Sequence, residues 1–388
     1  MSAVDLTSVL ADPALVRVWS ALPGARLVGG VVRDLLVGAP VADIDLATPD
    51  APDIVAHKLA SARIKSVPTG LAHGTLTAVV QSRGFEITSL RRDVASDGRH
   101  AVVAFTDDWR EDAARRDFTC NAMSVDRGGV LHDFFGGEAD LRAGKVRFVG
   151  DPAARLAEDY LRLLRFFRFQ ARFGLKPADA VTRQALTGAV PGLARLSVER
   201  VWHELKRILA TQDPRAAVAL MAELGVLSAV LPEGAAPDKL ATLIAAGAPV
   251  DPILRLAALL AGDTAAFAVR LRLSGAERDR LLAMHGDVPE DSSDDDALRR
   301  ALADAPRDIL LDRAWLTGRS LALRERIAAM PVPVFPLQGR DLAEAGIMPG
   351  PEIGRRLVEL RAWWLQAGCQ ADRTACLAAL RTAGNPTA

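Results

Sequence analysis

The pattern of hydrophobic residues changes near residue 150, and this change limits the folds open to the chain. Before it, short alternating runs rich in Val, Ile and Thr predict β-strands at residues 26–29, 43–47, 75–80, 85–89 and 102–106. Helices are expected between them at residues 31–37 and 52–61. After residue 151 the sequence is rich in Ala, Leu and Arg with helical periodicity, and long loops are expected at residues 231–238, 286–296 and 331–338. The sequence therefore predicts a mixed α/β domain followed by two or three helical modules.

Composition narrows the class of protein. A chain of 388 residues is too long for one compact core, which favours two to four domains. Three cysteines without a CxxC pair indicate a reducing compartment. We find no secretory leader and no apolar run of about 18–20 residues, so we expect a cytoplasmic protein without a membrane partner. Lys and Arg total 48, as do Asp and Glu, which counts against a nucleic-acid partner but leaves room for a local basic stripe.

A glycine turn follows the first expected strand. In the run LVGGVVRD, Gly29 and Gly30 separate the strand from the helix. Glycines let the backbone approach a ligand closely, and a helix start offers N–H groups and a positive dipole end to a phosphate. Arg33, in the first turn, could clamp the same anion. The alternative is a tight strand–helix turn with an Arg–Asp pair at the surface.

Two aspartates follow the turn at a spacing that suits a metal ion. Asp43 and Asp45 stand two residues apart in an expected strand, so both point to the same side. Adjacent carboxylates are costly without a cation between them, and Mg²⁺ accepts such oxygen ligands. Glu86, flanked by apolar residues in an expected neighbouring strand, could complete a two-metal cluster. The alternative for all three is an outward polar position on a strand.

A dense polar group lies at residues 111–123, just before an apolar segment. Arg115, Arg116 and Asp117 stand close to Thr119 and Asn121. Such a group could hold ribose hydroxyls and phosphates, whereas a charged helix cap is the alternative.

Residues 158–172 predict a single amphipathic helix. At about 100° per residue, one face carries five charged side chains: Glu158, Arg162, Arg165, Arg168 and Arg172. Glu158 stands four residues before Arg162, the favourable order for an ion pair that would hold this arginine in one pose. Asp159 and Arg162 together could read the edge of a base, and Arg165 could meet phosphates. A salt-bridged, solvated helix face is the alternative.

The histidines predict no metal or phosphohydrolase centre. The six histidines form no HxxxH pair and no His/Cys cluster with zinc spacing. His73 is expected in a turn, and neither a GxSxG motif nor a Walker A loop occurs.

Together, in order and spacing, these segments resemble the class II tRNA nucleotidyltransferase and bacterial poly(A) polymerase family. The stretches that match are LVGGVVRDLLVG with DID, RRDFTCNAMSVD and EDYLRLLRFFRF. The resemblance implies an α+β fold, with an N-terminal nucleotidyltransferase (polymerase-β-like) α/β head followed by an all-helical neck, body and tail. We expect a catalytic head at residues 1–148, a base-recognising neck at 149–230, a body at 231–330 and a tRNA-binding tail at 331–388.

The resemblance also implies roles for the matching residues. Asp43 and Asp45 correspond to catalytic metal ligands. The expected nucleotide-binding residues are Gly29, Gly30 and Arg33 for the triphosphate, Arg115, Arg116, Asp117 and Asn121 for ribose and phosphate, and Glu158, Asp159, Arg162 and Arg165 in the neck. Asp159 and Arg162 would hydrogen-bond the incoming base, while Glu158 orients Arg162. Residues 91–106 correspond to a flexible loop that helps to switch from C to A addition.

The expected reaction is attack of the tRNA 3′-hydroxyl on the α-phosphorus of CTP or ATP, which adds C, C and A and releases pyrophosphate. Two Mg²⁺ ions held by Asp43 and Asp45, with Glu86 as a further candidate, would assist it. No obligate protein partner is evident. A poly(A) polymerase or A-adding enzyme of the same family, an RNA-binding protein without activity and a helical interaction scaffold are the alternatives.

Overall fold

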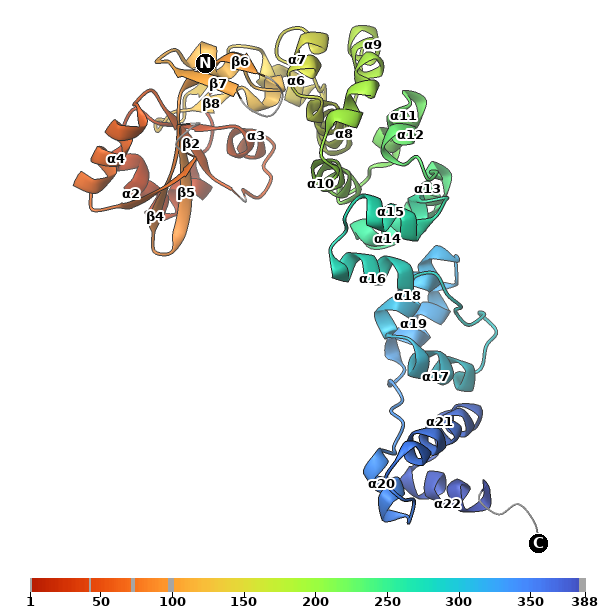
Figure 1. The fold of residues 1–388 in the computed structure, drawn as a ribbon. Helices are drawn as coiled ribbons and strands as arrows, with labels where there is room; N and C mark the ends of the chain where they lie inside the picture. Colours follow the sequence, from red (N-terminus) through yellow and green to blue (C-terminus); the bar gives the residue numbers. More distant parts are fainter. Residues whose placement is uncertain (1, 42, 71–73, 97–100, 384–388) are drawn as a thin grey trace. The chain divides into compact units, whose positions relative to one another are not determined.

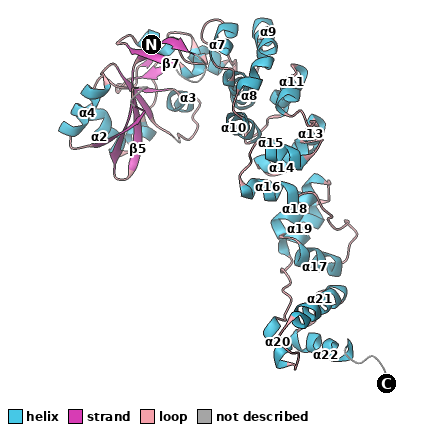
Figure 2. Cartoon of the chain, viewed as in Figure 1, coloured by secondary structure: helices cyan, strands magenta, loops and turns pink. Residues whose placement is uncertain are grey.

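The computed structural model describes residues 2–41, 43–70, 74–96 and 101–383. The chain divides into two units, Met1–Pro232 and Glu233–Ala388, and their elements are labelled in Figure 1. In the part of the chain that is described, all named strands lie in the first unit and the second unit is helical, as Figure 2 shows by colour. The expected change from a mixed head to a helical remainder is therefore confirmed. No helix within these described residues is long and apolar enough to cross a membrane.

A seven-stranded mixed sheet is the scaffold of the first unit. Its order is β3-β4-β5-β2-β1-β8-β9, and β2 and β5 are the parallel neighbours, while the other pairs are antiparallel. The strands are β1 (Arg26–Val28), β2 (Asp45–Thr48), β3 (Lys65–Gly70), β4 (Thr75–Val80), β5 (Arg83–Ser89), β8 (Ser124–Val125) and β9 (Leu131–His132). A separate two-stranded sheet pairs β6 (Arg91–Ser96) with β7 (Ala101–Phe105).

Alternation fixes which side of β5 faces the core. Phe85 and Ile87 are 1% exposed, whereas Glu86 between them is exposed. Since successive strand residues point to opposite faces, burial of the two apolar side chains turns the glutamate outward. The parallel pairing places Glu86 opposite Asp45 of β2, so two carboxylates from different segments become register partners.

The helices of the first unit precede its first strand in the sequence, lie between its strands or follow the last strand, β9. They are α1 (Thr7–Leu10), α2 (Pro13–Ala21), α3 (Gly30–Leu36), α4 (Pro52–Ser61), α5 (Trp109–Ala114), α6 (Gly137–Arg142), α7 (Pro152–Glu158), α8 (Leu161–Phe173), α9 (Ala180–Ala189), α10 (Val198–Leu209), α11 (Arg215–Glu223) and α12 (Val226–Val230), with 3₁₀ turns η2 (Thr119–Asn121) and η3 (Val190–Arg195). Several begin at an aspartate whose carboxylate accepts a backbone N–H of the first turn, as Asp151 does for α7.

An aromatic cluster joins the segment before η2 to helix α8. The ring of Phe118 lies 4.8 Å from that of Phe148 and 4.9 Å from that of Phe169, centroid to centroid. Phe148 also stacks on Phe166 of α8 at 5.8 Å. Such pairs each stabilise a fold by about 0.5–1.5 kcal/mol beyond the area they bury. The cluster therefore fixes α8 against the polar residues that neighbour Phe118.

The second unit consists of helices with two separate hydrophobic clusters. One cluster includes Leu298 and Leu310, and the other includes Leu342 and Trp364. The helices are α13 (Pro237–Ala245), α14 (Pro252–Leu259), α15 (Thr264–Arg270), α16 (Gly275–Ala283), α17 (Asp295–Asp304), α18 (Arg307–Leu316), α19 (Leu321–Ala329), α20 (Gly339–Glu344), α21 (Pro351–Gln366) and α22 (Arg373–Ala383). The gaps before α13, α17 and α20 coincide with the three expected loops, which are confirmed.

Candidate active site

A cavity of about 800 Å³ in the first unit gathers most of the predicted site residues. Ten arginines and five aspartates line it: Arg33, Arg91, Arg115, Arg116, Arg162, Arg165, Arg168, Arg172, Arg200 and Arg207, with Asp34, Asp43, Asp45, Asp117 and Asp159. The whole chain has equal numbers of basic and acidic residues, but arginines outnumber aspartates in the lining of this cavity. This local excess of positive charge suits an anionic ligand. Of the predicted set, only Glu86 and Glu158 do not line this cavity.

The glycine turn forms one wall of the cavity. Gly29 has a φ of +72°, a conformation that favours glycine, and α3 begins at the next residue, Gly30. A Cβ added at Gly29 would lie 3.3 Å from Nη1 of Arg116, so this guanidinium rests against the turn. The fold thus places the start of α3 beside the guanidinium of Arg116, an arrangement that can bind a phosphate.

Arg33 is buried rather than at the surface. Only 6% of it is exposed, and its guanidinium carbon lies 4.8 Å from the ring centroid of Phe173. Nη1 donates to Oδ1 of Asn121 at 2.8 Å, and Nε and Nη2 donate to Oδ1 of Asp34. The alternative of a surface Arg–Asp pair is therefore wrong, because both residues are buried and Arg33 lies against aromatic rings of α8.

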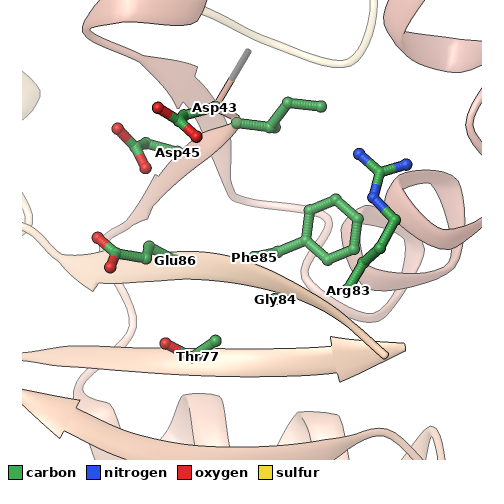
Figure 3. A pocket seen from close by; sticks show the side chains of 8 residues that line it. Asp43, Asp45, Thr77, Arg83, Gly84, Phe85 and Glu86 are labelled. Atoms are coloured by element: carbon green, nitrogen blue, oxygen red, sulfur yellow. The ribbon is translucent and has the colours of Figure 1, made fainter. Parts of the chain in front are cut away.

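Three carboxylates extend to the same side of the sheet, as Figure 3 shows for Asp43, Asp45 and Glu86. Asp45 begins β2, and Glu86 is its register partner on β5. Asp43 precedes the strand, so the expectation that both aspartates lie within it is wrong. A second cavity of about 600 Å³ is lined by all three and shares Asp43 and Asp45 with the first. The two aspartates thus stand where the cavities meet.

The surroundings of Asp45 suit a cation. Burial raises the pKa of the Asp45 carboxyl, and the neighbouring charges of Glu86 and Asp43 raise it further, against the opposing effect of Arg116. Carboxylate oxygens are the ligands that Mg²⁺ prefers, and this ion keeps positions for phosphate oxygens or water. Asp43 and Asp45 are therefore the residues that fit a divalent cation. Within the described residues, no three His, Cys, Asp or Glu side chains are grouped so that they could hold a metal ion.

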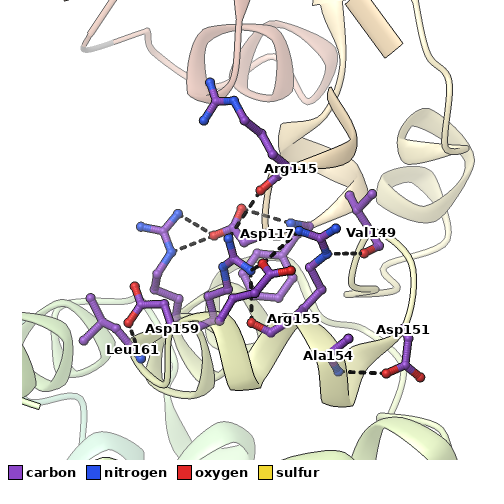
Figure 4. A network of polar contacts seen from close by, with 12 residues as sticks. Arg115, Asp117, Val149, Asp151, Ala154, Arg155, Asp159 and Leu161 are labelled. Carbon is purple, nitrogen blue, oxygen red and sulfur yellow. Dashed lines mark hydrogen bonds and ion pairs between the residues drawn. The ribbon is translucent and has the colours of Figure 1, made fainter. Parts of the chain in front are cut away.

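Asp117 is the centre of the opposite, arginine-rich side of the cavity. It is 7% exposed and accepts hydrogen bonds from Nε of Arg165 at 2.6 Å and from Nδ2 of Asn121 at 3.0 Å. Burial alone would raise the pKa of Asp117, but Arg165 and the hydrogen bonds outweigh it, so the pKa is lowered. Figure 4 shows this polar network, which continues to Asp159 and Arg155. The contacts with Arg165 and Asn121 thus favour the charged form of the Asp117 carboxylate and fix its position.

The expected single helix over residues 158–172 is wrong, because the chain breaks between α7 and α8. Glu158 ends α7, Asp159 is extended with a φ of −153°, and α8 begins at Leu161. The Asp159 carboxylate accepts the backbone N–H of Leu161 at 3.0 Å and a hydrogen bond from Nη2 of Arg200 at 2.8 Å. The break therefore presents Asp159 to the cavity at the start of α8, in a pose fixed by two donors.

Arg162 is held by the residues around the break. It forms the expected ion pair with Glu158, which also accepts from Nη1 of Arg155 at 2.9 Å. Nη1 of Arg162 donates to the carbonyl oxygen of Arg155 at 3.0 Å, and Nη2 donates to the carbonyl oxygen of Arg115 at 3.3 Å. Glu158 thus acts on the cavity through Arg162 rather than by lining it.

Arg168 of α8 contradicts the alternative of a solvated helix face, whereas Arg172 is exposed and ion-paired, as that alternative expects. Arg168 is 8% exposed, and its Nε donates to Glu204 of α10 at 2.7 Å. Arg172 pairs with Asp34 of α3 at 3.2 Å. The sequence analysis missed Glu204, Asp34 and Arg200 as partners, and their distance along the chain left no spacing signal that could have found them.

The segment expected as a flexible loop is largely paired. Residues 91–96 and 101–105 form β6 and β7 of the small antiparallel sheet, which agrees with the strand expected at residues 102–106, whereas a role of this segment in switching from C to A addition stays a prediction. Residues 97–100 lie outside the described residues, as does His73 with its expected turn.

Comparisons with known proteins agree over most of the chain. A family model for the poly A polymerase head domain matches residues 25–147, and one for the probable RNA and SrmB-binding site of polymerase A matches residues 179–236. Human mitochondrial CCA tRNA nucleotidyltransferase 1 is 36% identical over 380 residues, which cover 92% of this chain and 86% of that protein. The CCA-adding enzyme of Geobacillus stearothermophilus is 34% identical over 368 residues, covering 86% of each chain.

Solved structures give the same result. The crystal structure of the Bacillus stearothermophilus CCA-adding enzyme in complex with CTP matches with a TM-score of 0.76 and 26% identity, covering 96% of this chain and 98% of that chain. The Thermotoga maritima CCA-adding enzyme complexed with tRNA shares the fold, with a TM-score of 0.69 and 22% identity.

Proposed function

The chain belongs to the family of CCA-adding tRNA nucleotidyltransferases, and we propose that it adds C, C and A to the 3′ end of tRNA from CTP and ATP, releasing pyrophosphate. One observation carries the proposal: a single cavity joins the Asp43–Asp45 pair to the glycine turn and to the Asp159–Arg162 pair. A metal-binding side, a phosphate-binding side and a base-reading side thus meet in one space, as nucleotidyl transfer requires.

The reaction begins when the RNA 3′-hydroxyl attacks the α-phosphorus of the bound nucleotide. Asp43 and Asp45 would hold divalent cations beside it, and Glu86 of β5 lines the adjoining cavity with them. When two Mg²⁺ ions are bound there, they lower the pKa of the attacking hydroxyl and stabilise the charge on the departing pyrophosphate. The chain's own contribution is to position the nucleotide and neutralise its phosphates.

The phosphates would lie against the glycine turn and the two adjacent arginines. The N–H groups at the start of α3 and the guanidiniums of Arg115 and Arg116 face the same cavity. Arg33 also lines the cavity, where its hydrogen bond to Asn121 connects it to Asp117. Mainly positioning and charge neutralisation are needed for phosphoryl transfer, so no nucleophilic side chain is required.

The base would be read by Asp159 and Arg162. Arg200 fixes the first and Glu158 the second, so their hydrogen-bonding groups are oriented before the nucleotide arrives. A wrong base would leave buried donors or acceptors unsatisfied, at a cost of about 1–3 kcal/mol each. The protein would thus select C and A without a nucleic-acid template.

We also propose the four functional regions at residues 1–148, 149–230, 231–330 and 331–388. The catalytic head and the base-reading neck share one core through the Phe118 cluster, which supports their action on one nucleotide. Binding of tRNA by the tail and a cytoplasmic location stay predictions. The name of the human relative places that protein in mitochondria.

A poly(A) polymerase is the second candidate, because a poly A polymerase head model matches residues 25–147. The deciding experiment supplies Mg²⁺ and a tRNA lacking its last three nucleotides, with CTP alone, ATP alone or both. We expect growth by CC with CTP and by CCA with both nucleotides. Long A tails would favour the polymerase, and no growth under any condition would leave an RNA-binding protein as the better account.

A further inference from the structure

Helix α5 carries a buried aspartate outside the cavity. Asp112 is 3% exposed and is absent from the cavity lining. Asp108 caps the helix by accepting the backbone N–H of Arg110 at 2.7 Å, which fixes the start of this short element. A buried carboxylate is costly unless partners compensate its charge, so its contacts indicate its role.

The carboxylate of Asp112 divides its oxygens between two arginines of the cavity. Oδ1 accepts from Nε of Arg115 at 2.9 Å and from its Nη2 at 2.7 Å. Oδ2 accepts from Nη2 of Arg116 at 3.2 Å. Burial would raise the pKa of Asp112, but Arg116 and Arg115 outweigh it and the pKa is lowered. The aspartate therefore remains charged and holds both guanidiniums.

Arg115 and Arg116 each leave part of the guanidinium facing the cavity. Their side chains are 18% and 20% exposed, respectively, and both line the cavity. A guanidinium has five N–H donors in a rigid fork, and Asp112 engages only some of them. Arg116 extends from this hold to the turn at Gly29. Without the shared Asp112 carboxylate, the positive charges of Arg115 and Arg116 would repel each other, and the two guanidiniums would lose this orientation.

Helix α5 also holds both ends of the small sheet. Oδ1 of Asp112 accepts the backbone N–H of Arg91, where β6 begins, at 3.3 Å. The hydroxyl of Thr106, just after β7, donates to Oε2 of Glu111 at 2.7 Å. The arginine pair and the start of β6 therefore share the Asp112 carboxylate, while the neighbouring Glu111 holds the residue after β7.

We infer that Asp112 is a positioning residue for the phosphates of the incoming nucleotide: it aims the Arg115 and Arg116 guanidiniums into the cavity and ties them to the start of β6. The inference rests on the proposed function, because it takes those phosphates as the ligand.

The test separates phosphate binding from base binding in the full-length chain. Pyrophosphate and cytidine are measured as competitive inhibitors of CTP incorporation, since one reports the arginines and the other the base-reading pair. For Asp112→Asn we expect the inhibition constant of pyrophosphate to rise about tenfold, as expected when charge-assisted hydrogen bonds lose their geometry. The constant for cytidine should stay within about twofold, because the base-reading pair is not attached to this carboxylate.

Three further variants make the test decisive. Asp112→Glu retains the charge and should raise the pyrophosphate constant less than Asp112→Asn does. Asp312→Asn removes a carboxylate that is 6% exposed and paired with Arg280 in the second unit, and it should change neither constant. In an Arg115→Gln, Arg116→Gln background, Asp112→Asn should add at most about a twofold change, because its effect runs through those arginines.

Equal changes in both inhibition constants, or no change, would overturn the inference. So would a full additional loss in the background that lacks both arginines. Failure of the unchanged chain to incorporate CTP would instead overturn the proposed function, so the two failures are distinguishable.

Discussion

The two sides of the cavity treat negative charge in opposite ways. On the arginine side, Asp117 and Asp159 are each paired with a guanidinium, from Arg165 and Arg200. On the sheet side, no ion pair joins Asp43, Asp45 or Glu86 to a basic side chain in the described part of the chain, and the pKa of Asp45 is raised where that of Asp117 is lowered. Similar carboxylates in one cavity thus differ in whether the protein supplies their counter-charge.

This difference teaches how the site divides its work. The arginine side is complete within the chain, and under the proposed function its fixed donors and acceptors would read a base. The sheet side lacks such counter-charges, and under the same proposal cations from solution would neutralise its carboxylates and act on phosphate oxygens. The first side should contribute to the stability of the fold, and the second should cost stability until a cation binds.

The strongest way to break the comparison is to remove the sheet-side carboxylates. Asp43→Ala with Asp45→Ala should lower CTP incorporation by at least about 10³-fold, because the residues that fit the catalytic cations are gone. Affinity for tRNA, measured by filter binding, should stay nearly unchanged. Asp53→Ala, an exposed carboxylate on α4, is the matched control and should keep full activity. Wild-type rates in the double variant would refute this site.

Stability gives the next largest effect, with opposite signs at the two sides. Asp117→Asn should lower the free energy of unfolding by about 3 kcal/mol, because it leaves Arg165 without its buried partner. Asp45→Asn should leave that free energy unchanged or raise it in Mg²⁺-free buffer, since it removes repulsion among carboxylates. Urea denaturation compares the two variants with the unchanged chain. Equal destabilisation by both would show that the two sides do not differ.

The smallest effect is the pH dependence of unfolding without Mg²⁺. Asp117, whose pKa is lowered from 3.8, stabilises the fold above this value and loses the contribution as the pH falls through the lower pKa. Asp45, whose pKa is raised from 3.8, favours the fold when protonated and loses its contribution as the pH rises through the raised pKa.

Asp117→Asn should therefore flatten the acid side of a plot of Tm against pH. Asp45→Asn should remove a fall on the side above 3.8, and added Mg²⁺ should oppose that fall in the unchanged chain. If the plots of Tm against pH for Asp117→Asn and Asp45→Asn change in the same direction, the opposite pKa shifts of Asp117 and Asp45 are contradicted.

The sequence predicted local structure best where one face of a strand or helix is buried. The expected strand at 75–80 and helix at 52–61 have the bounds that the structure gives them, because apolar spacing alone determines these elements. β3 was missed because most of its residues are exposed and it contains Pro68, so it lacks alternation.

Site residues were predicted as a set, but their partners were not. The motifs identified the side chains that meet in the cavity, whereas the pairing of Arg168 with Glu204 of α10 was not predicted. The break at Asp159 was also missed, since residues 158–172 have continuous helical periodicity. The extended residue is stabilised by the backbone N–H of Leu161 and, from a distant part of the chain, by Arg200 of α10. Both the partners of the site residues and the break at Asp159 depend on tertiary contacts, which a local sequence pattern does not contain.

The packing of Tyr160, beside that break, has a consequence for mutational tolerance. A Cβ at Gly192 would lie 2.0 Å from Cδ1 of the Tyr160 ring, although Gly192 neither lines the cavity nor has a positive φ. Any side chain there would push on the segment that carries Asp159. Gly188, four residues earlier, has open space around it. Among random missense alleles, position 192 should therefore yield loss of function as readily as a catalytic position, while position 188 accepts substitution.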